Sequence, residues 1–194
     1  MSACPPFAAA HQTRPKAGET VCGDAAIVRT LGPSRMLFAL FDALGHGPLA
    51  AHASAIALAT LQACDDGVDL PALVDSLHEA LRGSRGAAAL VGLADGHALR
   101  ACIVGNVELR VSRNACAGII HSPGVLGVSV RKLRFFEGRV RPDDRLVAFS
   151  DGVSSRLAPS DLDGLGPVEA CAYALERFGT PLDDASVLVL DALP

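Results

Sequence analysis

Four aspartates in this sequence stand where an apolar run begins or ends. Asp24 opens the run "DAAIV", Asp42 closes "LFALFD", Asp151 follows "LVAFS" and Asp184 precedes "ASVLVL". Strand ends of one core can meet at the same sheet edge, and carboxylates that meet there repel one another unless a cation lies between them. Any one of these aspartates is also typical of a turn or a cap. As a set, they suggest a divalent metal site.

The donor atoms favour hard cations. Mg²⁺ and Mn²⁺ prefer carboxylate oxygen and water, whereas the six cysteines form no CxxC pair and no Cys/His cluster at zinc spacing. Two divalent ions would balance four aspartates and activate a water for attack on a phosphoester, without a covalent enzyme intermediate. We therefore expect two Mn²⁺ or Mg²⁺ ions and a phosphoester substrate.

Three other residues near these aspartates each have two possible roles. His46 lies in the turn "LGHG" after Asp42 and either takes part in catalysis or caps the helix that follows. Arg14 and Lys16 are the nearest basic residues upstream of Asp24. They either hold the substrate phosphate or are solvated loop charges.

The elements that must position these residues follow from the apolar periodicity. Short apolar runs predict strands over residues 22–31 and 34–41, and helical spacing predicts helices up to about residue 64 and over 70–82. A period-two pattern over 86–136 predicts an antiparallel meander. A strand over 145–149, a helix over 167–178 and a last strand from 185 complete the pattern. Because strands and helices do not alternate one for one, we expect an α+β fold with antiparallel sheets covered by helices.

Composition narrows the class of protein. The 194 residues suit a single domain over 1–194, and half of them are apolar. A net charge of −4 without a Lys/Arg block argues against nucleic acid as a partner. The uncharged window 43–64 is rich in alanine and interrupted by Gly and Pro, so we expect a buried helix and no membrane span. The N-terminus lacks a signal-peptide pattern, which predicts a cytoplasmic protein.

Together the motifs resemble those of the type-2C, metal-dependent serine/threonine protein phosphatases, and in particular their bacterial SpoIIE-like branch. The family places "GD" before an early strand, "DGxGHG" between a strand and a helix, "SDG" after a late strand and "DD" or "DN" before the last one. This sequence has, in the same order, Gly23-Asp24, Asp42-Ala43-Leu44-Gly45-His46-Gly47, Ser150-Asp151-Gly152 and Asp183-Asp184. The resemblance spans residues 10–191. It implies an α-β-β-α sandwich of two mainly antiparallel sheets flanked by helices.

The resemblance also implies roles for individual residues. Asp42 would bridge both ions, and Asp151 and Asp184 would complete the ligands of the first. Asp24 and the backbone carbonyl of Ala43 would bind the second. Asp183 is the alternative to Asp184, because both precede the same strand.

Three departures from the family pattern bear on these roles. Ala43 replaces the usual Gly and adds a Cβ beside the site. His46 lies four residues after Asp42 rather than two, so the general-acid role of the eukaryotic histidine does not transfer to it, and we assign it a supporting role. Asn106 in "VGNVELR" stands where many relatives have an aspartate that helps to hold a third ion.

The small size and the segments "VGNVELR" and "SPGVLG" are most like the RsbX-type stressosome phosphatases. The expected function is hydrolysis of phosphoserine or phosphothreonine in a stressosome-type regulatory protein by a monomeric enzyme. Three alternatives stay open: a SpoIIE- or RsbU-type phosphatase of an anti-anti-sigma factor, hydrolysis of another phosphoester, and a degenerate domain that only binds a phosphoprotein.

Overall fold

The strands and helices reproduce most of the predicted pattern. The computed structural model describes residues 7–112 and 118–193. In chain order its elements are β1 (Phe7–Arg14), β2 (Asp24–Thr30), β3 (Arg35–Ala43), α1 (Pro48–Ala63), α2 (Leu70–Ala80), β4 (Ala87–Asp95), β5 (Ala98–Val104), β6 (Glu108–Val111), β7 (His121–Ser122), β8 (Gly124–Val125), β9 (Ser129–Val130), β10 (Phe135–Arg139), β11 (Arg145–Phe149), the 3-10 helix η2 (Pro159–Leu162), α3 (Pro167–Phe178) and β12 (Ala185–Ala192).

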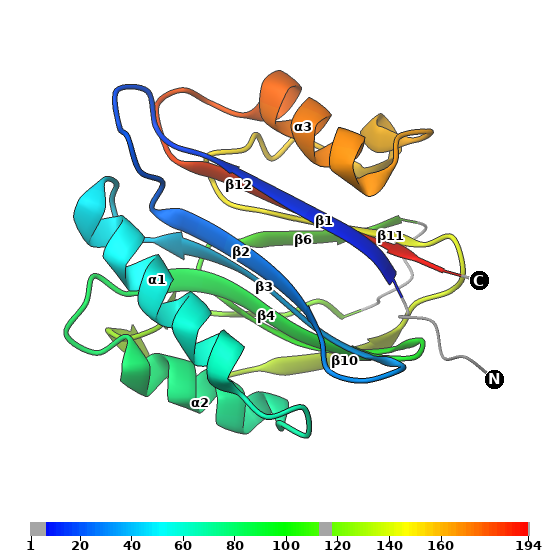
Figure 1. Ribbon diagram of the computed structural model, residues 1–194, viewed down its shortest axis with the longest axis horizontal. Helices are drawn as coiled ribbons and strands as arrows, with labels where there is room; N and C mark the ends of the chain where they lie inside the picture. The colour runs from blue at the N-terminus through cyan, green and yellow to red at the C-terminus, as the bar shows by residue number, and fades with distance from the viewer. Residues whose placement is uncertain (1–6, 113–117, 194) are drawn as a thin grey trace.

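Two sheets packed face to face form the centre of the molecule (Figure 1). The smaller sheet has the strand order β1-β12-β11-β6, and the larger has β10-β5-β4-β3-β2 with β7 added beside β5. All of these pairs are antiparallel except β5 with β7. The predicted antiparallel meander over 86–136 is therefore wrong beyond β5, because β6 pairs with β11 in the smaller sheet and β7 runs parallel to β5. Helices α1 and α2 cover the larger sheet, and α3 covers the smaller one. The predicted α-β-β-α sandwich is thus confirmed.

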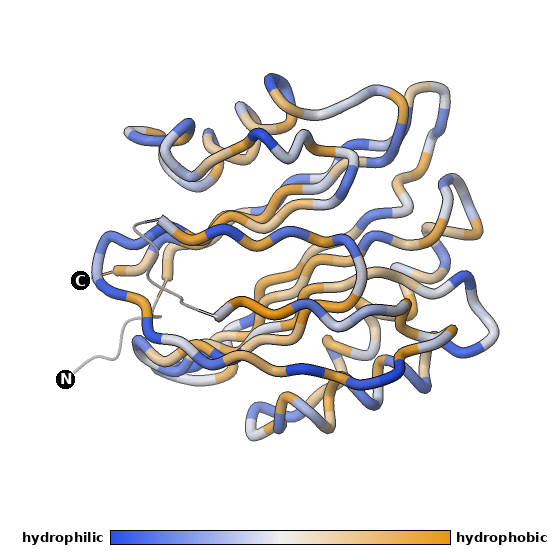
Figure 2. The backbone as a smooth tube through the Cα atoms, turned by 180° about the vertical axis from the view of Figure 1, so that it is seen from behind, coloured by the Kyte–Doolittle hydropathy of each residue, from blue (hydrophilic) through white to orange (hydrophobic). Residues whose placement is uncertain are grey.

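The alternation of side chains along β3 shows how three apolar layers are built. Phe38 and Leu40 belong to the core between the two sheets, whereas Ala39 and Phe41 face α1 and α2. A third layer lies between the smaller sheet and α3. Successive side chains on a strand point to opposite faces, so a strand covered on both sides is apolar throughout. Figure 2 shows this as hydrophobic colour along the central strands.

Helix α1 packs closely on the sheet because its buried side chains are small. Ala50, Ala53, Ala57 and Leu61 recur at helical spacing and are fully buried. Pro48 begins the helix directly after Gly47, whose φ of 74° suits glycine. The uncharged window 43–64 is therefore the end of a strand, a turn and a core helix. Within the described ranges, no helix combines the length and apolarity needed to cross a bilayer.

Strand β1 is an element that the sequence patterns did not predict. It pairs antiparallel with the whole of β12, from Phe7 opposite Ala192 to Arg14 opposite Ala185. Its sequence, "FAAAHQTR", mixes alanine with polar residues, and its burial shows no clean alternation. The strand exists because β12 offers it an edge, a tertiary cause that outweighs local propensity.

Candidate metal centre

The core between the sheets ends in polar residues at one edge. Asp24 and Asp42 are direct cross-strand partners in the register of β2 and β3, and both continue the face that carries the inter-sheet core. On the opposite sheet, Ser150 and Ser186 follow the same alternation past Ala148 and Leu188. Both serines are fully buried, and the backbone N–H of Ser186 donates to Ser150 Oγ at 2.9 Å. The strand ends thus converge as the sequence predicted for Asp24 and Asp42.

Burial and neighbouring carboxylates both act on the pKa values of Asp24 and Asp42. Burial, followed by the charges of Asp184 and Asp151, raises the pKa of Asp24 to about 7, while the nearby hydroxyls of Ser150 and Ser186 act in the opposite direction. Burial, followed by the charges of Asp24, Asp151 and Asp183, raises the pKa of Asp42 to about 8. Negative charges gathered in a poorly solvated place disfavour one another. A positive charge at this edge would therefore stabilise the ionised carboxylates.

Asp151 and Asp183 lie on the more open side of this group. Burial and the charge of Asp183 raise the pKa of Asp151, partly offset by Asp42 and Asn106. The Asn106 amide donates to Asp151 Oδ2 at 2.6 Å, so it orients this carboxylate. Asp183 Oδ1 accepts from the backbone N–H of the next residue, at 2.9 Å, and no other hydrogen bond of this carboxylate is found among residues 7–112 and 118–193. Asp42, Asp151 and Asp183 therefore form one electrostatic group.

Asp184 is used differently from its neighbour. It is 3% exposed, and its two oxygens accept the backbone N–H groups of Lys16 and Gly23, each at 2.8 Å. These bonds fasten the entry to β2 against the start of β12. The family resemblance favoured Asp184 over Asp183 as the ligand beside Asp42 and Asp151. Because both oxygens of Asp184 are bound by backbone N–H groups, these contacts favour Asp183 as that ligand. Asp184 instead positions the segment that carries Asp24.

Two glycines of the motifs are required by close packing around Asp184. A Cβ on Gly152 would lie 1.9 Å from the carbonyl oxygen of Asp184. A Cβ on Gly23 would lie 2.6 Å from Ala50 Cβ and 2.8 Å from Asp184 Oδ2. These distances leave no room for any side chain, which gives a physical reason for the "GD" and "SDG" patterns.

The turn after Asp42 is held by contacts that the sequence did not reveal. Ala43 is the last residue of β3 and 1% exposed, with its side chain in the core under α1 and α2. The methyl group that departs from the family pattern is thus accommodated on the face away from Asp42. His46 Nδ1 lies 2.6 Å from Glu19 Oε1, a pair that ties the turn to the β1–β2 loop.

The two basic candidates upstream of Asp24 have separate environments. The Arg14 guanidinium donates to the carbonyls of Leu175 and Thr180, both at 2.9 Å, and so holds the end of α3. That engagement is structural and differs from the phosphate-binding role considered from the sequence. The backbone N–H of Lys16 donates to Asp184, and its side chain forms no hydrogen bond or ion pair within the described residues.

The residues present fit a divalent cation. Asp24 is 5% exposed, yet its Oδ2 has no hydrogen-bond partner among the described residues. A buried carboxylate oxygen without a partner is costly unless a proton or a cation satisfies it. Within residues 7–112 and 118–193, no three or more His, Cys, Asp or Glu side chains lie together in an arrangement that would hold a metal ion without added water. Mg²⁺ keeps several waters and takes few protein ligands, so an open carboxylate group of this kind suits it.

Comparison with known proteins places the chain in a family. The family model described as stage II sporulation protein E (SpoIIE) matches residues 32–194. The chain belongs to the SpoIIE family. No curated protein sequence matches it.

Solved structures share the whole fold of this SpoIIE-family chain. A structure from work on the bacterial stressosome, described as a modular system adapted to control secondary messenger signalling, has 29% sequence identity and a TM-score of 0.86 over 95% of this chain and 98% of the other. RsbX in complex with magnesium has 20% identity and a TM-score of 0.82 over 96% and 95%. The catalytic domain of the serine/threonine phosphatase PstP with two manganese ions has 18% identity and a TM-score of 0.70 over 97% and 99%. Relatives with this fold thus bind the cations that the donor set predicts.

Proposed function

We propose that this protein is a phosphoserine/phosphothreonine protein phosphatase that depends on two Mn²⁺ or Mg²⁺ ions. The observation that carries the proposal is the convergence of carboxylates at one sheet edge. Burial and neighbouring carboxylates raise the pKa of Asp24, Asp42 and Asp151, Asp183 adds its charge beside Asp42 and Asp151, and Asp24 Oδ2 is buried with no hydrogen-bond partner among the described residues. Membership of the SpoIIE family and a fold shared with serine/threonine phosphatases support it. We propose that the enzyme acts in the cytoplasm as a single-domain monomer.

The proposed roles combine those that the family resemblance implies with the contacts of Asp183 and Asp184 described above. Asp42 would contact both ions. Asp151 and Asp183 would be further ligands of the first ion, and Asp24 and the Ala43 carbonyl would be further ligands of the second. Bound there, divalent ions would polarise the phosphoryl group and lower the pKa of a bound water, so that hydroxide is available to attack phosphorus.

The remaining contacts preorganise these ligands. Asn106 fixes the orientation of Asp151, and Asp184 fixes the strand entry that carries Asp24. The pair of His46 with Glu19 fixes the turn that follows Asp42. We give His46 this supporting role and assign no general acid.

Hydrolysis of p-nitrophenyl phosphate tests the proposal. We expect Mn²⁺-dependent activity that a chelator abolishes, and a loss of at least about a hundredfold in kcat for Asp42→Asn and for Asp151→Asn. Asp75→Asn, on the exposed face of α2, is the control and should keep full activity. Activity that persists in chelator, or in both active-site variants, would refute the dimetal mechanism.

The proposed substrate is a phosphorylated regulatory protein of the stressosome type. The structural likeness to a protein of the bacterial stressosome and to RsbX supports it. Comparing a phosphorylated stressosome scaffold with a phosphorylated anti-anti-sigma factor tests this choice, and faster hydrolysis of the anti-anti-sigma factor would assign the SpoIIE- or RsbU-type role. Activity confined to small phosphoesters would identify a different phosphoesterase, and tight binding of a phosphoprotein without turnover would identify a degenerate domain.

A further inference from the structure

A pocket with two arginines opens beside Asp151. Its walls are the turn after β11 and the end of α3 with the residues that follow it, and they include Asp151, Ser154, Arg156, Arg177 and Thr180. Asp151 therefore belongs both to the candidate metal centre and to this pocket. A substrate whose phosphoryl group lies at the carboxylates would extend its neighbouring groups over Asp151 into the pocket.

Backbone hydrogen bonds join the two walls. The N–H of Ser154 donates to the carbonyl of Phe178, and the N–H of Thr180 donates to the carbonyl of Gly152, each at 2.8 Å. Val153 and Gly179 form an isolated antiparallel bridge between these bonds. The pocket is thus formed by paired backbone rather than by two independent loops.

Other arginines fasten the two walls from behind. Arg110 on β6 donates to the carbonyls of Ser155 at 2.6 Å and Leu157 at 2.7 Å, which are the neighbours of Arg156 on either side. On the other wall, Arg14 holds the carbonyls of Leu175 and Thr180. These contacts fix the backbone on both sides of the pocket, so each arginine of the pocket is presented from a fixed base.

The guanidinium groups of the two pocket arginines have no ionic or hydrogen-bonded partner in the part of the chain that the structure describes. Arg156 and Arg177 are exposed, and neither forms an ion pair or a side-chain hydrogen bond with any residue in the described ranges. By contrast, Arg145 is bound by Asp191 and two carbonyls, and Arg110 and Arg14 are bound by carbonyls. Arginine binds carboxylate and phosphate through charge-assisted, frequently bidentate hydrogen bonds. Two guanidinium groups in one pocket are therefore suited to bind an anion.

We propose that Arg156 and Arg177 bind an anionic side chain of the substrate protein, adjacent to the phosphorylated residue that is hydrolysed. This inference rests on the proposed phosphatase function and specifies its substrate class. The anion is a carboxylate or a second phosphoryl group, because both have the oxygens that a guanidinium recognises. The pocket would then select phosphorylated segments of high negative charge.

Peptides that differ only beside the phosphoserine test the proposal. Three peptides of equal length carry the phosphoserine between alanines, between aspartates, or between non-hydrolysable phosphonate analogues of phosphoserine. We expect kcat/KM to be about tenfold or more higher for the anionic peptides than for the alanine peptide, mainly through a lower KM. Equal gains for the two anionic peptides would indicate that the pocket accepts either anion. A larger gain for the aspartate peptide would indicate carboxylate recognition, and a larger gain for the phosphonate peptide would indicate recognition of a second phosphoryl group.

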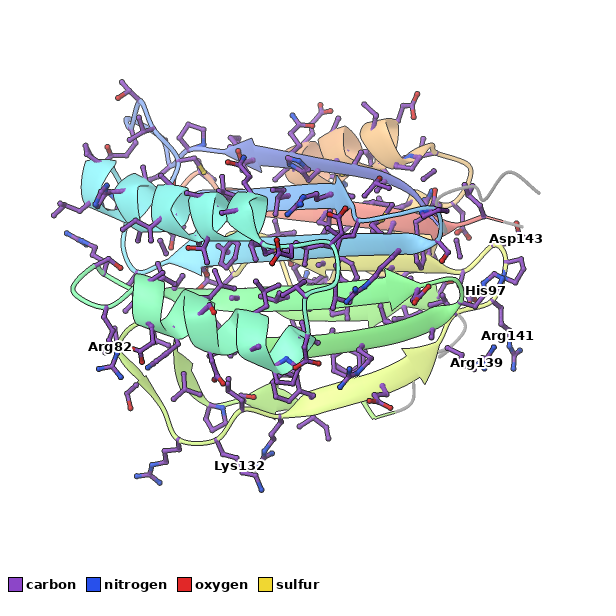
Figure 3. The ribbon with its side chains drawn as sticks, turned by 60° about the horizontal axis from the view of Figure 1, so that its bottom comes forward. Arg82, His97, Lys132, Arg139, Arg141 and Asp143 are labelled. Carbon is purple, nitrogen blue, oxygen red and sulfur yellow. The ribbon has the colours of Figure 1, made fainter. Side chains whose placement is uncertain are left out.

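Variants then assign the preference to the pocket. Arg156→Gln combined with Arg177→Gln should reduce the ratio of kcat/KM between anionic and alanine peptides to about one. Arg139→Gln removes an exposed arginine from the end of the molecule opposite the carboxylates, where Figure 3 shows it beside Arg141, and should keep the wild-type ratio. No preference in the wild type, or a preference that survives the double substitution, would overturn the proposal.

Binding measurements separate this proposal from the phosphatase function. Fluorescence anisotropy with labelled peptides, in the presence of Mn²⁺, gives the same comparison without turnover. If the protein hydrolyses nothing yet binds the anionic peptides more tightly in an Arg156- and Arg177-dependent way, the phosphatase function fails and the pocket stands. If it hydrolyses all three peptides equally and binds them equally, the pocket fails and the phosphatase function stands.

Discussion

Replacing Asp24 by asparagine should make the metal-free protein more stable at alkaline pH. In the folded protein the pKa of Asp24 is about 7, against 3.8 for the ordinary group, and burial is the main cause. A carboxyl with a raised pKa binds its proton more tightly in the folded state than in the unfolded chain. Its contribution to stability is therefore complete below about pH 4 and is lost as the pH rises towards 7.

The size of the effect follows from the same pKa. Between pH 5 and the folded pKa of about 7 lie about two pH units, each worth about 1.4 kcal/mol, so wild type loses about 3 kcal/mol through Asp24. Asparagine resembles the protonated carboxyl and does not titrate. The variant also relieves Asp42 of one of the charges that raise its pKa, which flattens the pH dependence further.

Urea unfolding in chelator at pH 5 and pH 8 measures this difference. The free energy of unfolding of wild type should fall by about 3 kcal/mol more than that of Asp24→Asn over this interval. Asp75→Asn on exposed α2 should behave like wild type. Added Mn²⁺ should stabilise wild type at pH 8 more than the variant, because a ligand that binds only the folded state stabilises it. Equal pH dependence of wild type and Asp24→Asn would refute the reasoning.

Two further substitutions probe the surroundings of the site. Gly152→Ala would place a Cβ 1.9 Å from the Asp184 carbonyl oxygen, and we expect a loss of several kcal/mol in thermal unfolding, whereas Gly67→Ala meets no atom within 4 Å and should be nearly neutral; equal Tm values for the two variants would contradict this packing argument. Asn106→Asp would replace an amide that donates to Asp151 at 2.6 Å by a second carboxylate. Calorimetric titration should therefore show that the variant binds Mn²⁺ more tightly than wild type, and in chelator the Tm of the variant should be lower than that of wild type. Unchanged Mn²⁺ affinity would argue against a cation beside Asp151.

The sequence predicts the elements whose burial is periodic and strong. Strands β2, β3, β11 and β12 and helix α3 were expected close to their observed bounds, because their apolar runs are long and end at turn residues. The convergence of Asp24 and Asp42 follows from strands β2 and β3 alone. Strand β1 was missed, because alanine and polar residues become a strand there only through pairing with β12.

The finer features of the site depend on contacts that local pattern does not encode. Asp183 and Asp184 are adjacent and identical in type, and only the distant N–H groups of Lys16 and Gly23 distinguish them. The pair of Glu19 with His46 likewise depends on how the β1–β2 loop folds back over the turn. Such features follow from tertiary structure, so the sequence could offer them only as alternatives.

The pairing of β1 with β12 determines when the site can exist during folding. Strands β2 to β5 with α1 and α2 are continuous in the chain, apart from short turns, so these four strands of the larger sheet can form early from contacts of low sequence separation. The smaller sheet joins residues 7–14 to residues 185–192 and cannot be completed on the ribosome before β12 has emerged. Asp24 and Asp42 are thus in place on a half-built domain, whereas Asp151 and Asp183 reach them last. Metal binding would then report completion of the whole fold rather than of either sheet alone.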